Sequence, residues 1–263
     1  MKKLKNDLPR VYNFSGGATS GLMTILGEPG PNDIVLFTDT KWESPGTYQF
    51  LDDFEKYECI KVHRATFTNK RSPDLEGFHS LLNYKTYLPN RTKRLCTDEL
   101  KVKTAKRYLR SIGIQSFHSM VGFRADEQSR ILEYKQRYRK VVPHFPLNEM
   151  GITKEMVDQY WMLKPYKLNI PRILGNCDLC FLKGKDAIIR ILQHHPELAD
   201  KWIAAEDHAA ALCASKGKNV TPTFIKDITY RQMLKIAQSQ RTLFDEVRLN
   251  ELEPAFNCSC NNG

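Results

Sequence analysis

Apolar residues in the first half of the chain form short continuous runs, separated by stretches with helical periodicity. Continuous apolar runs with polar ends are typical of strands buried on both faces, whereas spacings of three and four residues are typical of helices. The predicted strands are residues 11–14, 33–38, 60–63 and 117–122. One predicted helix begins near Ser20, and a second spans residues 47–57. This alternation predicts an α/β fold with a doubly wound, mostly parallel sheet, whose ligands bind at the carboxyl ends of the strands.

Helical periodicity dominates the second half of the chain, and no clear strand follows after about Pro143. The predicted helices there span residues 153–163, 185–194, 196–215 and 229–238. We therefore expect an α/β domain over residues 8–145 and a helical subdomain over residues 146–263.

A long polar stretch at residues 66–95 interrupts the first pattern. It predicts a loop that contains one short helix at residues 78–82. A further helix with Thr97 as its N-cap follows, and the acidic residues in its first turn suit the positive end of a helix.

Composition excludes some classes of protein. Hydrophobic residues make up 41% of the 263 and charged residues 27%, which is ordinary for a globular protein. No run of about 18 apolar residues exists, and none follows the basic residues 1–7, so we expect no membrane span, no secretory signal and a cytoplasmic location. In that reducing compartment the seven cysteines are expected to be free or metal-bound, with Cys59 and Cys213 buried in the core.

The charge balance points to anionic partners. The chain carries 40 Lys and Arg residues against 30 Asp and Glu residues, a formal charge of +10. Such a surplus favours nucleotides, nucleic acid or both as partners. A solvated lysine surface is the alternative, because a basic stripe rather than a basic total identifies a nucleic-acid-binding protein.

A glycine-rich loop connects the first predicted strand to the first predicted helix, with the sequence Ser-Gly-Gly-Ala-Thr-Ser-Gly. Glycines allow backbone N–H groups to approach a phosphate, the helix N-terminus adds partial positive charge, and hydroxyl groups add donors. The loop lacks the Gly-Lys-Ser/Thr ending of a Walker A motif. It predicts an anion site rather than a plain turn, and its candidate nucleotide-binding residues are Ser15, Gly16, Gly17, Thr19 and Ser20.

Two further strand ends carry residues suited to a nucleotide. Asp39 ends the second strand and could accept hydrogen bonds from a ribose or adenine group, or simply close a turn. Arg124 and Arg130 follow the strand at residues 117–122 and could bind phosphate or sulfate bidentately. A surface helix with a Glu–Arg pair is the alternative for these arginines.

Five cysteines are candidates for metal binding or nucleophilic chemistry. Cys177 and Cys180 form a CxxC unit, Cys258 and Cys260 form a second pair, and Cys96 stands alone before a helix. One tail cysteine with the other three would complete a site of four thiolates, which suits either zinc or an iron–sulfur cluster. A redox pair and unliganded thiols remain the alternatives.

The glycine-rich loop resembles the PP-loop of ATP pyrophosphatases and phosphoadenosine phosphosulfate (PAPS) reductases. Thr19 stands where the usual loop has Asp, and this Ser-Gly-Gly-x-Thr-Ser form is similar to phage-encoded members of the PAPS reductase family. The Asp39-Thr40 turn before a Pro-x-Thr helix start resembles the family's second-strand motif. Residues 122–130 match its Gly-x-Arg-x-x-Glu-x-x-Arg segment. For a phage protein, the expected location is the host cytoplasm.

The same resemblance implies a cofactor. Residues 94–101 are similar to the Cys-x-x-x-x-Lys segment of the iron–sulfur branch, the assimilatory adenylyl-sulfate reductases. It implies a [4Fe–4S] cluster, with Zn²⁺ as the alternative, and Lys101 beside it acting on an anionic substrate; otherwise Lys101 is a solvated helix residue. The implied metal ligands are Cys96, Cys177, Cys180 and Cys260. The Glu-Cys-Gly-Leu-His tail of sulfonucleotide reductases is absent, so Cys258 or Cys260 would be the nucleophile.

These implications lead to three hypotheses. The first is an enzyme that binds PAPS, adenylyl sulfate (APS) or ATP, with Mg²⁺ as a further candidate, and reduces a sulfonucleotide with a thiol reductant or transfers sulfur. The second is an ATP-dependent, adenylylating sulfurtransferase or modifier of nucleic acid. The third is a non-catalytic nucleotide-binding accessory factor with a structural zinc ion. Oligomeric state stays open.

Overall fold

The computed structural model describes residues 8–85, 87–137, 143–171 and 173–239, and a parallel sheet lies at its centre. Its five strands run in the order β3-β2-β1-β6-β7, and each neighbouring pair is parallel. Their bounds are β1 (Arg10–Asn13), β2 (Ile34–Asp39), β3 (Val62–Thr66), β6 (His118–Met120) and β7 (Pro143–His144). The predicted doubly wound, mostly parallel α/β sheet is therefore confirmed.

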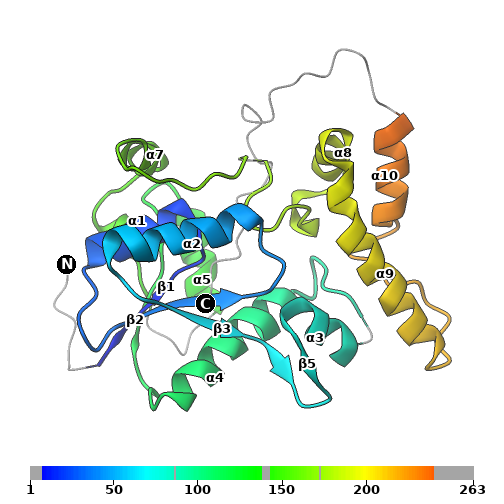
Figure 1. Cartoon of the computed structure of the whole chain (residues 1–263), viewed down its shortest axis with the longest axis horizontal. Coiled ribbons are helices and arrows are strands. Elements are labelled where there is room, and N and C mark those ends of the chain that lie inside the picture. Colours follow the sequence, from blue (N-terminus) through cyan, green and yellow to red (C-terminus); the bar gives the residue numbers. More distant parts are fainter. Residues whose placement is uncertain (1–7, 86, 138–142, 172, 240–263) are drawn as a thin grey trace.

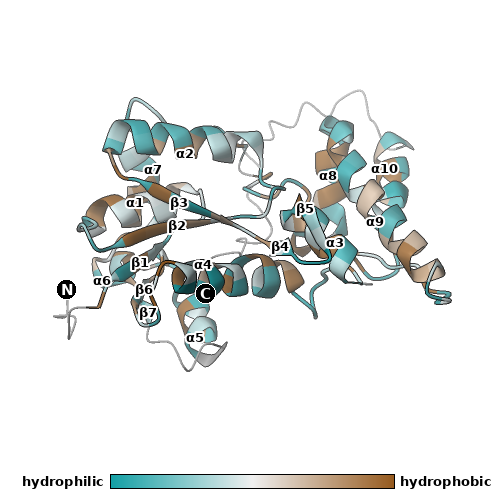
Figure 2. Cartoon of the chain, turned by 60° about the horizontal axis from the view of Figure 1, so that its bottom comes forward, coloured by the Kyte–Doolittle hydropathy of each residue, from teal (hydrophilic) through white to brown (hydrophobic). Residues whose placement is uncertain are grey.

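Helices cover both faces of this sheet. In Figure 1, α1 (Ala18–Gly27), α2 (Pro45–Glu58) and α7 (Lys154–Met162) lie above the strands, and α4 (Thr104–Ser111) lies below them. Because successive strand residues point to opposite faces, Tyr12 packs with the upper helices while Val11 packs with Ala105 of α4. Burial on both faces explains the continuous apolar runs, which Figure 2 shows along the central strands.

The polar stretch at residues 66–95 contains more structure than a loop. It forms an antiparallel hairpin of β4 (Thr68–Asn69) and β5 (Ser72–Glu76), followed by α3 (Gly77–Tyr84). The predicted short helix at 78–82 lies inside α3. The hairpin was not predicted, because its strands are short and largely exposed and so carry no alternation of apolar residues.

The helix predicted from Thr97 has a different beginning. A π-helix, η1 (Cys96–Lys103), precedes α4 directly. Thr97 is buried inside η1 and its hydroxyl has no hydrogen-bond partner among the described residues, so the prediction that Thr97 is the N-cap is wrong. The acidic first turn, with Asp98 and Glu99, is as predicted.

Three of the remaining described helices gather at one end of the molecule (Figure 1). Two 3₁₀ turns, η2 (Phe181–Lys183) and η3 (Pro196–Leu198), accompany α8 (Lys185–His194), α9 (Ala199–Ala214) and α10 (Tyr230–Ser239) (Figure 1). Two further helices, α5 (Gln128–Arg137) and the short α6 (Pro146–Glu149), flank β7 in the sequence. β7 itself corrects the expectation that no strand follows Pro143, since two residues are too few to give a pattern.

A shared apolar core joins this helical end to the segments that follow β2 and β3. Trp42 and Phe78 stack with ring centroids 4.1 Å apart, and Trp202 of α9 packs edge-on against Trp42 at 5.1 Å. This core therefore contains residues from both sides of the predicted boundary at 145/146, and that boundary stays a prediction. Within the described residues, no helix is both long and apolar enough to cross a bilayer.

The two cysteines that we expected in the core differ. Cys213 is buried in α9, as predicted. Cys59 is exposed, because it is the C-cap of α2 with a φ of +54° rather than part of the following strand, so its predicted burial is wrong.

Candidate functional site

The glycine-rich loop forms a tight turn between β1 and α1. Gly16 has a φ of +73°, and a Cβ atom there would lie 2.4 Å from Cγ2 of Thr47, so the position needs glycine. The Ser20 hydroxyl donates to the Gly17 carbonyl at 2.9 Å and accepts from the backbone N–H groups of Ser15 at 3.1 Å and Gly17 at 3.3 Å. Ser20 is buried and braces the loop, whereas Ser15 and Thr19 are partly exposed.

Asp39 lies at the same edge of the sheet as the loop, because it ends β2 and β1 is the neighbouring parallel strand. Its Oδ1 atom accepts from the Lys41 N–H at 2.7 Å and from the Tyr48 hydroxyl at 2.8 Å, and its Oδ2 atom lies 3.2 Å from Lys41 Nζ. Burial, with the Asp39 carboxylate as a second cause, raises the pKa of Tyr48 well above its usual value. Both alternatives for Asp39, nucleotide ligand and turn residue, thus remain compatible with its position.

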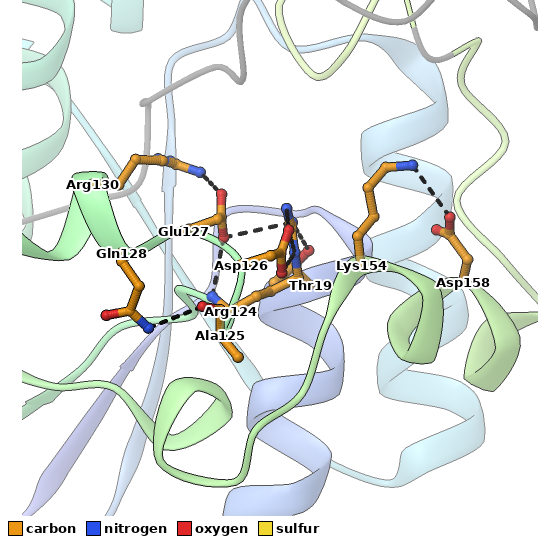
Figure 3. Close-up of polar contacts among 9 residues, drawn as sticks. All are labelled: Thr19, Arg124, Ala125, Asp126, Glu127, Gln128, Arg130, Lys154 and Asp158. Carbon is orange, nitrogen blue, oxygen red and sulfur yellow. Dashed lines mark hydrogen bonds and ion pairs between the residues drawn. The ribbon is translucent and has the colours of Figure 1, made fainter.

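Arg124 brings the segment after β6 to the loop (Figure 3). Its Nη1 atom lies 3.4 Å from the Thr19 hydroxyl, a contact between residues 105 positions apart. The guanidinium also pairs with Asp126 at 2.9 Å and lowers the pKa of that carboxyl below its usual value. Arg124 is buried, so its charge is held at the first turn of α1.

Arg130 is directed to a protein carboxylate. It forms an ion pair with Glu127, and its guanidinium lies 4.5 Å from the centre of the Phe123 ring. Glu127 also accepts from the backbone N–H of Arg124 at 3.0 Å, so this buried carboxylate links the two arginines (Figure 3). The Glu–Arg pair that the sequence left open is present, and an anion-binding role for Arg130 stays a prediction.

The CxxC segment contacts the glycine-rich loop through Asn176. Its side-chain amide donates to the Ser15 carbonyl at 2.7 Å, and its own carbonyl accepts from the Ser44 N–H at 2.7 Å. The bond to Ser15 joins residues 161 positions apart and places Cys177 next to the loop. The sequence analysis did not select Asn176, and its place directly before the CxxC unit was the available signal.

Two of the predicted metal ligands pack against one apolar core cluster, and a third is buried. Cys180 is buried, and Cys96 and Cys177 are partly buried against the same cluster. Burial, with the neighbouring thiols of Cys180 and Cys177 as further causes, raises the pKa of Tyr230. In chemistry these thiols fit a zinc ion or an iron–sulfur cluster.

Their geometry does not by itself form a metal site. Across the described ranges, no three His, Cys, Asp or Glu side chains are grouped so that they could hold a metal ion. Cys258 and Cys260, the two candidates for the nucleophile, of which Cys260 is also the implied fourth ligand, lie outside the described residues. The cluster and its ligand set therefore stay predictions.

Lys101 is a buried residue of η1 rather than a solvated one. Its Nζ atom lies 3.6 Å from Oε1 of Glu43, whose side chain is almost fully buried. The Thr40 hydroxyl donates to the same Glu43 oxygen at 2.9 Å. Lys101 is thus linked through Glu43 to the turn that follows Asp39, and its action on a substrate stays a prediction.

Comparison with known proteins agrees with this geometry. The phosphoadenosine phosphosulfate reductase domain family matches residues 9–169, well over half of the chain. That range includes the glycine-rich loop, Asp39, the Arg124 segment and Cys96, and it ends before the CxxC unit. The chain is also 28% identical to the uncharacterized nin region protein ORF290 of Escherichia phage lambda over 203 residues, which are 68% of this chain and 67% of that protein. The chain therefore belongs to the phosphoadenosine phosphosulfate reductase domain family.

Proposed function

We propose that this protein is an enzyme that binds an adenine nucleotide at the carboxyl edge of its sheet and uses it for sulfur chemistry. The observation that carries the proposal is the convergence of Arg124 and Asn176 on one glycine-rich loop, which brings a buried cation and the CxxC segment to the same turn. Family membership supports the nucleotide as the ligand. Sulfonucleotide reduction or sulfur transfer is the proposed reaction.

Each part of the loop has a proposed task in binding. Backbone N–H groups of the first turn of α1 and the Ser15 and Thr19 hydroxyls would bind phosphate oxygens, helped by the helix dipole. The Arg124 guanidinium would exchange part of its hydrogen bonding with Asp126 for hydrogen bonds to the anionic ligand. Asp39 would accept from the ribose or adenine group in place of one of its present donors.

The cysteines are proposed to supply the sulfur chemistry. Cys96, Cys177, Cys180 and Cys260 would hold a [4Fe–4S] cluster, or Zn²⁺ as the alternative. Such a cluster would supply redox capacity for the reaction. Lys101 would stabilise negative charge on the substrate, and Cys258 would be the free thiolate available for attack on sulfur.

The two metals are separated by the colour and metal content of the purified protein. Anaerobically purified protein should be brown, with visible charge-transfer absorbance, and should contain iron and sulfide. Colourless protein with one zinc ion per chain would end the iron–sulfur proposal. The Cys260→Ser variant should lose metal, whereas Cys258→Ser should keep its metal and lose turnover.

A second candidate function is modification of nucleic acid. Two adjoining cavities, of about 640 and 540 Å³, share Tyr87, Thr92 and part of their basic lining. The basic residues that line them are Arg91, Lys93, Arg94, Lys185 and Lys226. The same walls include Phe181 and Leu182, which directly follow the CxxC unit. A basic hollow beside the cysteines favours a polyanionic acceptor for sulfur.

Product analysis distinguishes these two reactions. Release of sulfite from PAPS or APS with a thiol reductant would support sulfonucleotide reduction. Conversion of ATP to AMP and pyrophosphate that is stimulated by RNA or DNA would support adenylylating sulfur transfer. If the protein binds none of ATP, PAPS and APS, the proposed function is wrong.

A further inference from the structure

Lys183 is a buried cation at the end of η2. Only 8% of its surface is exposed. Within the described ranges, no residue accepts a hydrogen bond or forms an ion pair with its ammonium group. Burial of an unpaired charge is costly, and lysine is almost never buried unless it is paired. An anionic partner that binds from solution would offset this cost.

The position of the Lys183 ammonium relates it to the glycine-rich loop. A Cβ atom placed on Gly175 would lie 3.6 Å from Lys183 Nζ. Gly175 has a φ of +59° and immediately precedes Asn176, whose amide binds the Ser15 carbonyl. The ammonium group therefore lies beside the residue that precedes Asn176, the point of contact between the CxxC segment and the loop.

Other buried cations near this edge have protein carboxylates as partners. Lys101 pairs with Glu43 at 3.6 Å, and Arg124 pairs with Asp126 at 2.9 Å. Lys183 differs from both, since no carboxylate of the described residues neutralises it. Arg124 contacts the loop at Thr19, and Lys183 lies beside Gly175, which precedes the loop-binding Asn176. Two separate segments therefore bring positive charge toward the loop.

We propose that Lys183 forms an anion subsite, in which its ammonium group binds a phosphate or sulfate oxygen of the bound nucleotide. The inference rests on the proposed function, which places that nucleotide at the loop. An ammonium group on a flexible stem suits this task, because it can rotate its donors toward whichever oxygen is nearest. The subsite gives the CxxC segment a direct part in nucleotide recognition.

The test compares wild type and Lys183→Met by titration calorimetry with ATP, PAPS, APS and adenosine. Adenosine shares the base and ribose but lacks the anionic group. Lys183→Met should weaken binding of whichever anionic nucleotide the wild type binds by about 10- to 100-fold, the loss of one charge-assisted hydrogen bond. Adenosine affinity should stay within about twofold of wild type, since the adenosine contacts are retained.

Two further variants separate binding from folding. Lys183→Arg keeps the charge and should recover much of the lost affinity, and Lys235→Met, on the exposed face of α10, should bind like wild type. Without nucleotide, Lys183→Met should unfold at the same or a higher temperature than wild type, because an unpaired buried charge has been removed.

Three results would overturn the subsite, and a fourth would overturn the proposed function on which it rests. Unchanged ATP and PAPS affinity in Lys183→Met would show that the ammonium group does not touch the ligand. Equal weakening for adenosine and the anionic nucleotides would place its effect elsewhere. A lower unfolding temperature with normal affinity would make Lys183 a structural residue. Failure of the wild type itself to bind any of ATP, PAPS and APS would remove the proposed function rather than this residue alone.

Discussion

Individual charged residues at the carboxyl edge of the sheet hold one another in place. Asp39 binds Lys41 and Tyr48, Glu43 binds Lys101, and Asp126 binds Arg124. A nucleotide that enters would exchange with these partners rather than meet free groups. The charges are thereby kept in position while the site has no ligand, which is the physical basis of preorganisation.

Gly16 is a residue at which this edge tolerates little change. Gly16→Ala should lower the free energy of unfolding by about 2–4 kcal/mol, because a positive φ and a close contact with Thr47 both oppose the new methyl group. Gly113→Ala is the matched control, since Gly113 has a φ of +85° with nothing within 4 Å of its Cβ position. That control should cost only about 1 kcal/mol. Equal losses in urea denaturation would contradict the tight packing of the loop.

At the scale of elements, the sequence was informative where strands are buried on both faces. The strands at residues 11–14 and 33–38 were predictable because the helices above and below require apolar side chains on both sides. The β4–β5 hairpin and β7 were not, because backbone pairing rather than side-chain burial defines them. Motifs in the sequence selected candidate site residues, but they did not predict which residues those side chains would contact.

The contact of the CxxC segment with the loop is such a case, since Asn176 and Ser15 are 161 positions apart. Asn176→Ala removes this link and should increase the rate of Cys177 alkylation by iodoacetamide several-fold, because the segment opens more often. Asn69→Ala removes a single side-chain bond in the distant hairpin and is the control. Peptide mass spectrometry gives the rate at Cys177. The same rate in both variants would mean that the link does not restrain the segment.

Glu206 of α9 binds the first residue of α10, and its carboxyl group makes the stability of the protein depend on pH. Its carboxylate accepts from the Tyr230 N–H at 2.8 Å, and burial raises its pKa from 4.5 to about 7. Between those values the folded protein holds a proton that the unfolded chain has lost, so this residue's contribution to stability falls as pH rises from about 4.5 to about 7. Glu206→Gln should match wild type at low pH.

The size of that effect is the measurable prediction. Near pH 8, Glu206→Gln should be more stable than wild type by about 1–3 kcal/mol in urea denaturation, since the buried charge is gone. Asp74→Asn, at an exposed position of β5, should show no such difference. If Glu206→Gln and wild type instead differed in stability by the same amount at every pH, the carboxylate would be shown to stay charged in the folded protein.

At the scale of the whole molecule, part of the +10 charge lies on the basic residues that line the two adjoining cavities. The basic residues around the two adjoining cavities lie next to the segment that follows Cys180, so a polyanion bound there would pass close to the cysteines. Arg91→Glu with Lys226→Glu should weaken binding of single-stranded RNA by at least about 10-fold at low salt. The slope of log affinity against log salt should also become shallower, because fewer phosphates are neutralised.

A charge-matched control gives this prediction its force. Lys70→Glu with Arg71→Glu changes the net charge by the same amount at the tip of the β4–β5 hairpin, away from the cavities. If attraction depended on total charge alone, both double variants would lose affinity equally in fluorescence anisotropy. A selective loss at the cavities would favour nucleic acid as the sulfur acceptor, and an equal loss would leave small sulfonucleotides as the better-supported substrates.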